Sequence, residues 1–252
     1  MQLIRTKSRI WILSALAFIS TFGCRTCLAH DATAHRLIRQ AVVSYRAVQN
    51  YTCRLDKRVR KNGVLHEDLD ILVKYKKPRN YYFRWMHGKA KGREVIFVAG
   101  EHQDKLVAHP GGLLRFLTFY LDPQGPLAMQ ANRHSLRDSG MEKIVAIMET
   151  NEKLALDRGL DALRLISEDK FGRTDMWVIE GTFPPGQGYY AHRVIICMSR
   201  SLQLPVKISI FDWSNELIEE YTFRNLSINV GLTEDDFDPG NPEYDYLISQ
   251  RR

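Results

Sequence analysis

The chain has 252 residues, a formal net charge of +7 and 44% hydrophobic residues, a balance typical of a globular protein. Residues 1–29 contain four basic and no acidic residues, so the rest of the chain carries only +3. So small a basic excess does not favour nucleic-acid binding, and the basic stretch Lys57 to Lys61 fits a solvated strand and turn. We expect no nucleic-acid partner.

The first 29 residues predict a signal peptide. Arg5, Lys7 and Arg9 precede the apolar run IWILSALAFIS, and small residues lead to a cleavage site after Ala29. The alternative is an uncleaved anchor helix, although the run is shorter than the ~20 residues of a membrane span. We therefore expect an exported protein of the periplasm or cell envelope.

The same region offers a second processing site at Cys24. The sequence TFGC places a small residue before the cysteine, as lipoprotein processing requires. Acyl chains on Cys24 would give peripheral membrane association. The remainder, residues 30–252, is expected to form one domain, because its length is ordinary for a single core and no linker or repeat divides it.

The elements of this domain begin with an amphipathic helix. Apolar residues recur at helical spacing from Leu37 to Val48, and Asp31 or Thr33 can cap the helix. Strands follow, and the pair Asn62-Gly63 predicts a two-residue hairpin turn, because both positions of a type I′ turn need positive φ.

The middle of the chain is rich in turns and leads into a second helix. Ser139 and Glu142, in the sequence SGME, match a capping box, and apolar residues continue at helical spacing after them. About five strands lie on each side of this helix. The layout predicts an α+β fold with a large curved antiparallel sheet, a half-barrel whose concave face the helices cover.

Apolar strand residues on the inner face are the candidate binding site. They are plain core if the helices fill the concavity, and they line a pocket suited to an acyl chain if the helices leave room. The residues are Phe83, Trp85, Phe97, Trp177, Val178, Ile208, Ile210 and Phe223.

Cys53 and Cys197 admit two interpretations. An oxidising compartment would permit a disulfide between them, and the alternative is two free thiols in strands.

The stretch HPGG, His109 to Gly112, resembles the oxyanion loop of some esterases. The sequence has no G-x-S-x-G nucleophile motif, and Ser139 is better explained as a helix cap. We expect HPGG to be a turn and the protein not to be an enzyme. A hydrolase is the alternative, and it predicts a Ser or Cys within hydrogen-bond reach of His109 or His192.

Metal and cofactor signals are weak. The histidines are scattered, and the acidic tail, residues 235–245, lacks the ligand order of a calcium-binding EF-hand. We expect a solvated acidic loop, no metal and no cofactor.

Three segments carry a resemblance to a known family. The stretches GREVIFVAGEHQDKLVAH, LDPQGPLAM and LTEDDFDPGNPEY resemble an exported bacterial family classified as a domain of unknown function. The layout is similar to the LolA/LolB-like lipoprotein-carrier superfamily, including a terminal F-x-P segment, here Phe237 to Pro239. The resemblance implies an unclosed barrel that binds lipid or lipoprotein acyl chains, and it implies no catalytic residues.

We therefore expect a non-enzymatic protein that binds a lipid or a lipidated protein in its concavity, with residues 110–135 as a lid. The alternative is a cell-envelope interaction or sensor module without lipid cargo, which predicts an exposed apolar patch outside the concavity.

Overall fold

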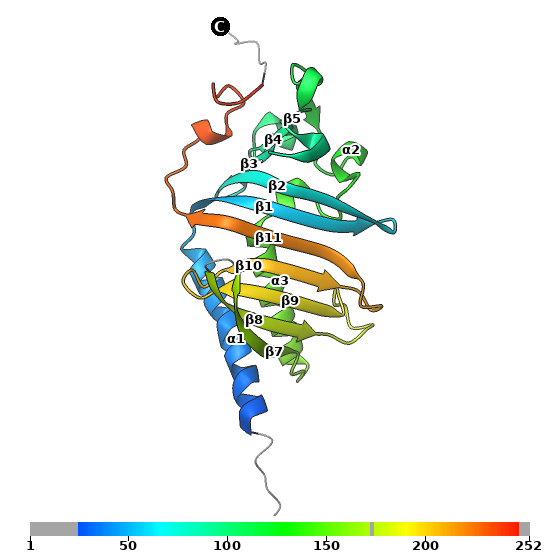
Figure 1. The fold of residues 1–252 in the computed structure, drawn as a ribbon, viewed down its shortest axis with the longest axis vertical. Helices are drawn as coiled ribbons and strands as arrows, with labels where there is room; N and C mark the ends of the chain where they lie inside the picture. Colours follow the sequence, from blue (N-terminus) through cyan, green and yellow to red (C-terminus); the bar gives the residue numbers. More distant parts are fainter. Residues whose placement is uncertain (1–24, 172–173, 247–252) are drawn as a thin grey trace, which may run out of the picture.

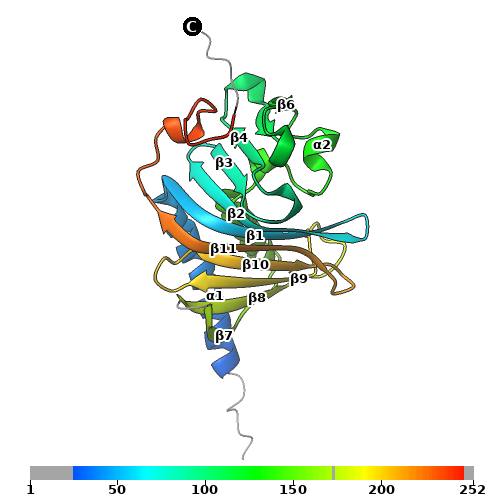
Figure 2. The ribbon, with the colours of Figure 1, turned by 45° about the horizontal axis from the view of Figure 1, so that its top comes forward.

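The computed structural model describes residues 25–171 and 174–246. Within these residues, eleven strands form one antiparallel sheet in the order β6-β5-β4-β3-β2-β1-β11-β10-β9-β8-β7. The sheet twists and curls, and α1 and α3 lie on the same side of it (Figures 1 and 2). Because β6 and β7 are its two edges, the sheet is open and not a closed barrel. The predicted fold class, a large curved antiparallel sheet with covering helices, is confirmed.

The two halves of the sheet come from two runs of consecutive strands, and β1 pairs with β11 where the halves meet. The first run is β1 (Asn50–Lys61), β2 (Val64–Lys76), β3 (Asn80–Trp85), β4 (Glu94–Phe97), β5 (Leu106–His109) and β6 (Phe119–Leu121). The second run is β7 (Leu163–Phe171), β8 (Thr174–Thr182), β9 (Arg193–Ser199), β10 (Pro205–Phe211) and β11 (Leu217–Ile228).

The hairpin between β1 and β2 has the predicted turn. Asn62 has φ 51° and Gly63 has φ 77°, so both turn residues adopt the positive φ of a type I′ turn. The long strands on either side alternate, with one set of side chains on the concave face and the other on the convex face.

Helix α1 (Arg25–Arg46) begins earlier than predicted. The cap was expected at Asp31 or Thr33, but residues 26–31 contain neither proline nor glycine, and the helix continues through them. The predicted signal peptide, residues 1–29, falls largely on residues 1–24, which lie outside the described residues, as does Cys24. The predicted cleavage site after Ala29 falls within α1.

Helix α3 (Met141–Asp157) is where the sequence predicts it, but the expected capping box is wrong. The N-cap residue is Gly140, with φ 89° and no side-chain cap bond. Ser139 Oγ instead donates to the Ser135 carbonyl, and Glu142 accepts a hydrogen bond from the Tyr75 hydroxyl. Tertiary contacts thus replace the local cap.

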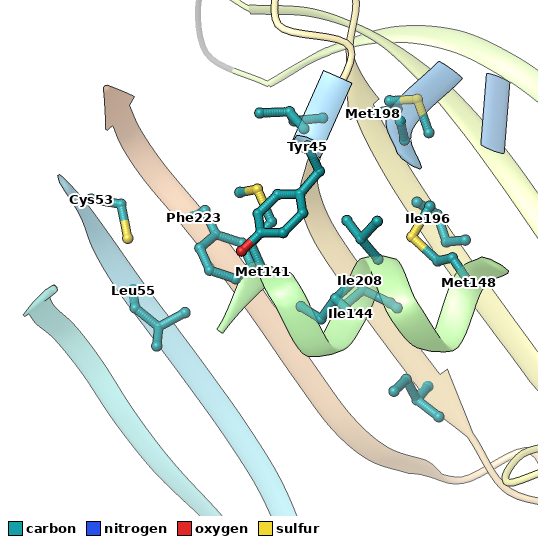
Figure 3. Close-up of a cluster of buried hydrophobic side chains, with 14 of the residues drawn as sticks. Tyr45, Cys53, Leu55, Met141, Ile144, Met148, Ile196, Met198, Ile208 and Phe223 are labelled. Carbon is teal, nitrogen blue, oxygen red and sulfur yellow. The ribbon is translucent and has the colours of Figure 1, made fainter. Parts of the chain in front are cut away.

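The main core lies between the concave face and the two helices. Apolar side chains of α3 meet those of β1, β9, β10 and β11 there, with Tyr45 of α1 alongside (Figure 3). A smaller core lies on the convex face, where Phe237, Tyr244 and Tyr246 of the C-terminal segment pack on Tyr82 and neighbouring strand residues. No helix within the described residues is long and apolar enough to span a membrane.

The remaining elements are short. Helix α2 (Pro126–Met129) lies in the turn-rich middle, and 3₁₀ turns occupy Gly88–Ala90, His102–Asp104, Gly112–Leu114, Leu136–Asp138 and Asp235–Phe237.

Candidate functional site

An apolar pocket lies between α3 and the concave face of the sheet. Its empty space is about 1290 Å³, part of which is open to solvent. Strands on both sides of the β1–β11 junction form its floor, α3 contributes one wall, and residues 132–140 contribute another. The helices therefore cover the concavity without filling it, which was the open question from the sequence.

Apolar side chains dominate the lining. Besides the residues predicted from the sequence, the apolar lining comprises Ile38, Leu55, Ile71, Leu136, Ile144, Ile147, Met148, Leu163, Phe183, Ala191, Val194 and Ile196. Most of this lining comes from rigid strands and a helix, so the space is largely preformed.

Five of the predicted residues line this pocket together: Phe83, Trp85, Ile208, Ile210 and Phe223. Phe97, on β4, is buried in the same core but does not line the pocket. Trp177 is only partly buried and packs at the border of the core, with the Arg200 guanidinium 5.3 Å from its ring centroid. Which part of the inner face remains open depends on where α3 lies.

Val178 was wrongly assigned to the inner face. It follows Trp177 directly in β8, and successive residues of a strand face opposite ways. Val178 pairs with Cys197 of β9, whose neighbours Ile196 and Met198 belong to the concave core. Val178 therefore faces the convex side.

Sequence reasoning missed the residues of α3 and the polar end of the pocket. Ile144 and Met148 were recognised as an apolar helical stripe but were assigned only to covering the sheet. Ile147 also lines the pocket, although it is only partly buried. The sequence signal that could have identified Ile147 is that it is an apolar helix residue outside the main apolar stripe.

The polar end of the pocket centres on Glu219 of β11, which is 1% exposed. Its carboxylate accepts hydrogen bonds from the Tyr190 hydroxyl and, at 2.8 Å, from the Tyr221 hydroxyl. His134 Nε2 and Arg133 Nε each lie 3.3 Å from Glu219 Oε1. Burial raises the pKa of Glu219, but these donors outweigh it and lower the pKa below its usual value. Glu219 is therefore ionised and fully partnered.

A second contact set holds residues 129–134 over the same strand ends. The buried Lys57 donates to Asn132 at 2.7 Å and pairs with Asp68 at 2.9 Å. Lys61 donates to the carbonyls of Met129 and Asn132. Of the predicted lid, residues 110–135, only the part from Asn132 onward reaches the pocket.

The HPGG stretch is a turn, as expected. It ends β5 and enters the 3₁₀ turn Gly112–Leu114. The ring of His109 is buried, with Nδ1 3.0 Å from the Pro110 carbonyl oxygen and Nε2 3.3 Å from Glu94 Oε2. His192 Nδ1 lies 3.1 Å from the Phe183 carbonyl oxygen. The partners of His109 and of His192 Nδ1 are thus a carboxylate and backbone carbonyls, not a nucleophile.

Cys53 and Cys197 are both free, which corresponds to the second interpretation of the sequence. Cys53 faces the concave core from β1, whereas Cys197 is on the convex side of β9. Strands β11 and β10 lie between them, a separation of three strand spacings of about 4.8 Å each. A disulfide cannot bridge that distance across the sheet.

The acidic tail is bound to the sheet by ion pairs. Asp236 pairs with Lys74 at 2.7 Å, and Tyr244 stacks on Tyr82 with ring centroids 4.2 Å apart. Within residues 25–171 and 174–246, no group of three or more His, Cys, Asp or Glu side chains is arranged to hold a metal ion.

An exposed apolar patch lies outside the concavity, between Leu113 and Leu127. Such a patch is what the interaction-module interpretation expects. Leu113 is 94% exposed and Leu127 is 73% exposed.

A comparison with known protein families identifies the family to which the chain belongs. Residues 48–246 match the family described as "Protein of unknown function (DUF1571)". The chain belongs to the DUF1571 family. The match begins just after α1 and runs through the C-terminal segment, so DUF1571 takes in the entire sheet, α3 and the pocket lining except Ile38 of α1. A search of curated proteins finds no match.

Solved structures similar to this DUF1571 chain share little sequence with it. Lipoprotein LppX of Mycobacterium tuberculosis is 12% identical, with 82% of this chain and 100% of that chain covered and a TM-score of 0.48. A putative outer membrane lipoprotein-sorting protein domain from Vibrio parahaemolyticus is 10% identical, with 82% and 97% covered and a TM-score of 0.39. MucB from the Pseudomonas aeruginosa MucA/MucB complex is 16% identical, with 82% and 60% covered and a TM-score of 0.43.

Proposed function

We propose that this DUF1571 protein is exported to the periplasm or cell envelope and binds a lipid, or the acyl chains of a lipoprotein, in the pocket under α3. The observation that carries the proposal is the pocket itself, which is lined mainly by aliphatic and aromatic side chains and encloses about 1290 Å³ of empty space, solvent-open space included. The protein acts without catalysis in this proposal.

Burial supplies the driving force. Each methylene that moves from water into an apolar site contributes about 0.8 kcal/mol, so an acyl chain of a dozen carbons gains enough to be held firmly. Phe83, Trp85 and Phe223 provide aromatic surface along the floor, and Ile208 and Ile210 provide aliphatic surface. At the polar end of the pocket, Glu219 is fully buried and already paired, so it offers a ligand few free hydrogen-bonding groups. This favours cargo with a long apolar part.

The segment from Asn132 to Gly140 is the proposed lid. Its contacts to Lys57 and Glu219 lie at the Asn132 end, whereas the Ser139 carbonyl accepts a hydrogen bond from Tyr81 at the other end. In this proposal the lid opens from the Asn132 end and stays attached at Ser139. The signal peptide at residues 1–29, with Cys24 as the alternative lipidation site, would deliver the protein to the compartment where such cargo occurs.

Titration with a fluorescent fatty acid tests whether the pocket binds acyl chains, using one pair of variants. Ile147→Glu places a carboxylate at the partly open wall of the pocket and should weaken binding about tenfold or more. Leu156→Glu is the control, because Leu156 is half exposed on the same helix and does not line the pocket. Equal binding by both variants, with Ile147→Glu as well folded as the control, would contradict an acyl-chain site here.

A further inference from the structure

Seven large apolar side chains are gathered at one edge of the sheet, within fifteen residues of sequence. We call them the β6 patch; their exposed fractions run from 37% to 94%: Leu113, Leu114, Phe116, Leu117, Phe119, Tyr120 and Leu127. Phe119 and Tyr120 are successive residues of β6 and face opposite sides of the sheet, so the patch extends over both faces of this edge, and its largest part is the turn that carries Leu113, Leu114, Phe116 and Leu117. Exposed apolar side chains gathered in this way mark a site of interaction with a protein or a membrane. The pocket uses none of these residues.

The residues of the β6 patch lie on backbone that is held by strand pairing and turn hydrogen bonds. Strand β6 pairs with β5, so that Tyr120 is opposite Val107 and Phe119 is opposite Ala108. Leu113 and Leu114 belong to a 3₁₀ turn, and the Leu117 amide donates to the Leu114 carbonyl at 3.0 Å. Helix α2 lies beside β6 at the same end of the molecule (Figure 2). Leu127 of α2, which is 73% exposed, therefore lies at the same end of the molecule.

Basic side chains lie at one end of this patch. The turn at residues 87–93 packs directly against Gly111, whose added Cβ would lie 1.9 Å from the Lys91 carbonyl oxygen. That turn carries Lys89, Lys91 and Arg93, all exposed or near the surface, and Arg115 lies within the patch itself. Residues 87–93 and 110–121 contain no acidic residue.

Acidic residues lie at the other end of β6. Glu101 and Asp104 lie in the β4–β5 turn, where His102 contacts the ring of Tyr120 with centroids 5.9 Å apart, and Asp122 follows β6. The surface thus has a basic side, which includes Leu113 and Phe116, and a mixed side at Tyr120.

We propose that the β6 patch docks this protein on an anionic membrane surface. Leu113, Phe116 and Leu127 would enter the boundary between headgroups and acyl chains, and the neighbouring Lys and Arg side chains would contact anionic headgroups. A second copy of the chain is the competing occupant, because a symmetric contact could place the basic end of one patch against Glu101, Asp104 and Asp122 of the other.

The docking surface is separate from both the pocket and the N-terminal region. The described part of α1 begins at the end of the molecule opposite the β6 patch (Figures 1 and 2). Contact through the patch therefore does not depend on an anchor at Cys24, and it does not depend on whether the pocket holds a lipid.

Flotation of the full protein with vesicles tests the proposal. Phosphatidylcholine vesicles containing about 30% phosphatidylglycerol should carry the protein, pure phosphatidylcholine vesicles should carry less, and about 0.5 M salt should weaken the anionic component. Leu113→Ser, Phe116→Ser and Leu127→Ser combined should lower the partition coefficient about tenfold or more.

The matched control combines Leu156→Ser, Trp213→Ser and Val64→Ser, which remove exposed apolar side chains elsewhere on the surface. Circular dichroism confirms that each variant is folded. The proposal is overturned if the wild type does not float with anionic vesicles, or if the patch and control variants float equally. A dimer in analytical ultracentrifugation that the patch variant alone loses, without vesicle binding, would assign the surface to a second copy.

Discussion

Glu94 and His109 face each other across β4 and β5, with Glu94 Oε2 3.3 Å from His109 Nε2 and both side chains fully buried. The pair also holds the C-terminal segment. The Asp245 backbone amide donates to Glu94 Oε2 at 3.3 Å, and the ring of Tyr246 meets that of His109 edge-on with centroids 4.6 Å apart. The histidine that suggested an oxyanion loop is therefore a structural link between the sheet and the chain's C-terminal segment.

This pair predicts a pH-dependent stability. Burial lowers the pKa of His109, but the adjacent Glu94 carboxylate and the Pro110 carbonyl outweigh it and raise the pKa above the usual 6.5. The stabilisation is complete below 6.5 and is lost as the pH rises through the higher pKa of the folded state. We expect the free energy of unfolding to fall as the pH rises above 6.5 more steeply for the wild type than for His109→Gln, measured by urea denaturation.

The same variant should also be less stable near pH 6, by about 1–3 kcal/mol, because Glu94 loses a charged partner and keeps only Arg84 at 3.2 Å as an ion-pair partner. Parallel pH profiles for the two proteins would contradict a charged His109.

The two glycines of HPGG are expected to differ in their tolerance of a methyl group. A Cβ at Gly111 would lie 1.9 Å from the Lys91 carbonyl oxygen, whereas a Cβ at Gly112 would meet no atom within 4 Å. Gly111→Ala should cost about 3 kcal/mol or more, or prevent folding, because backbone must move. Gly112→Ala, at φ 72°, should cost only about 1 kcal/mol. Similar unfolding midpoints in urea for the two variants would refute the close packing of Gly111 on the 91–93 turn.

Cys53 and Cys197 should form no disulfide, and an alkylating reagent should reach them at different rates. Burial raises the pKa of both, and Cys53 is more deeply buried than Cys197. Alkylation of the native protein should therefore label Cys197 before Cys53, and unfolding without reductant should expose both to labelling. Peptide mapping by mass spectrometry reads out each site, and a Cys53–Cys197 cross-linked peptide would show that the strand order is wrong.

Local signals in the sequence were enough to predict much of the sheet. Asn62 and Gly63 fixed one hairpin, and alternation identified the faces of Phe83, Trp85, Ile208 and Ile210 correctly. The short edge strand β6 was missed, because two exposed residues and one partly buried residue give no alternating pattern.

Features that depend on contacts between residues far apart in the sequence could not be predicted from local patterns. Ser139 lost its expected capping role because Tyr51 and Tyr81 occupy the helix start, where the Tyr81 hydroxyl donates to the Ser139 carbonyl at 2.6 Å. Cys53 and Cys197 could be assigned to strands, but their separation depends on the strand order. Phe97 and Trp177 share the concave side with the pocket residues, and only the position of α3 excludes them from the lining.

Native mass spectrometry tests the central claim most directly. The protein, purified without detergent from an exporting host in the form that the host produces, should carry extra mass that organic extraction removes and that proves to be phospholipid or acyl chain. A bare protein mass that stays unchanged after incubation with lipid would contradict acyl-chain binding in the pocket under α3.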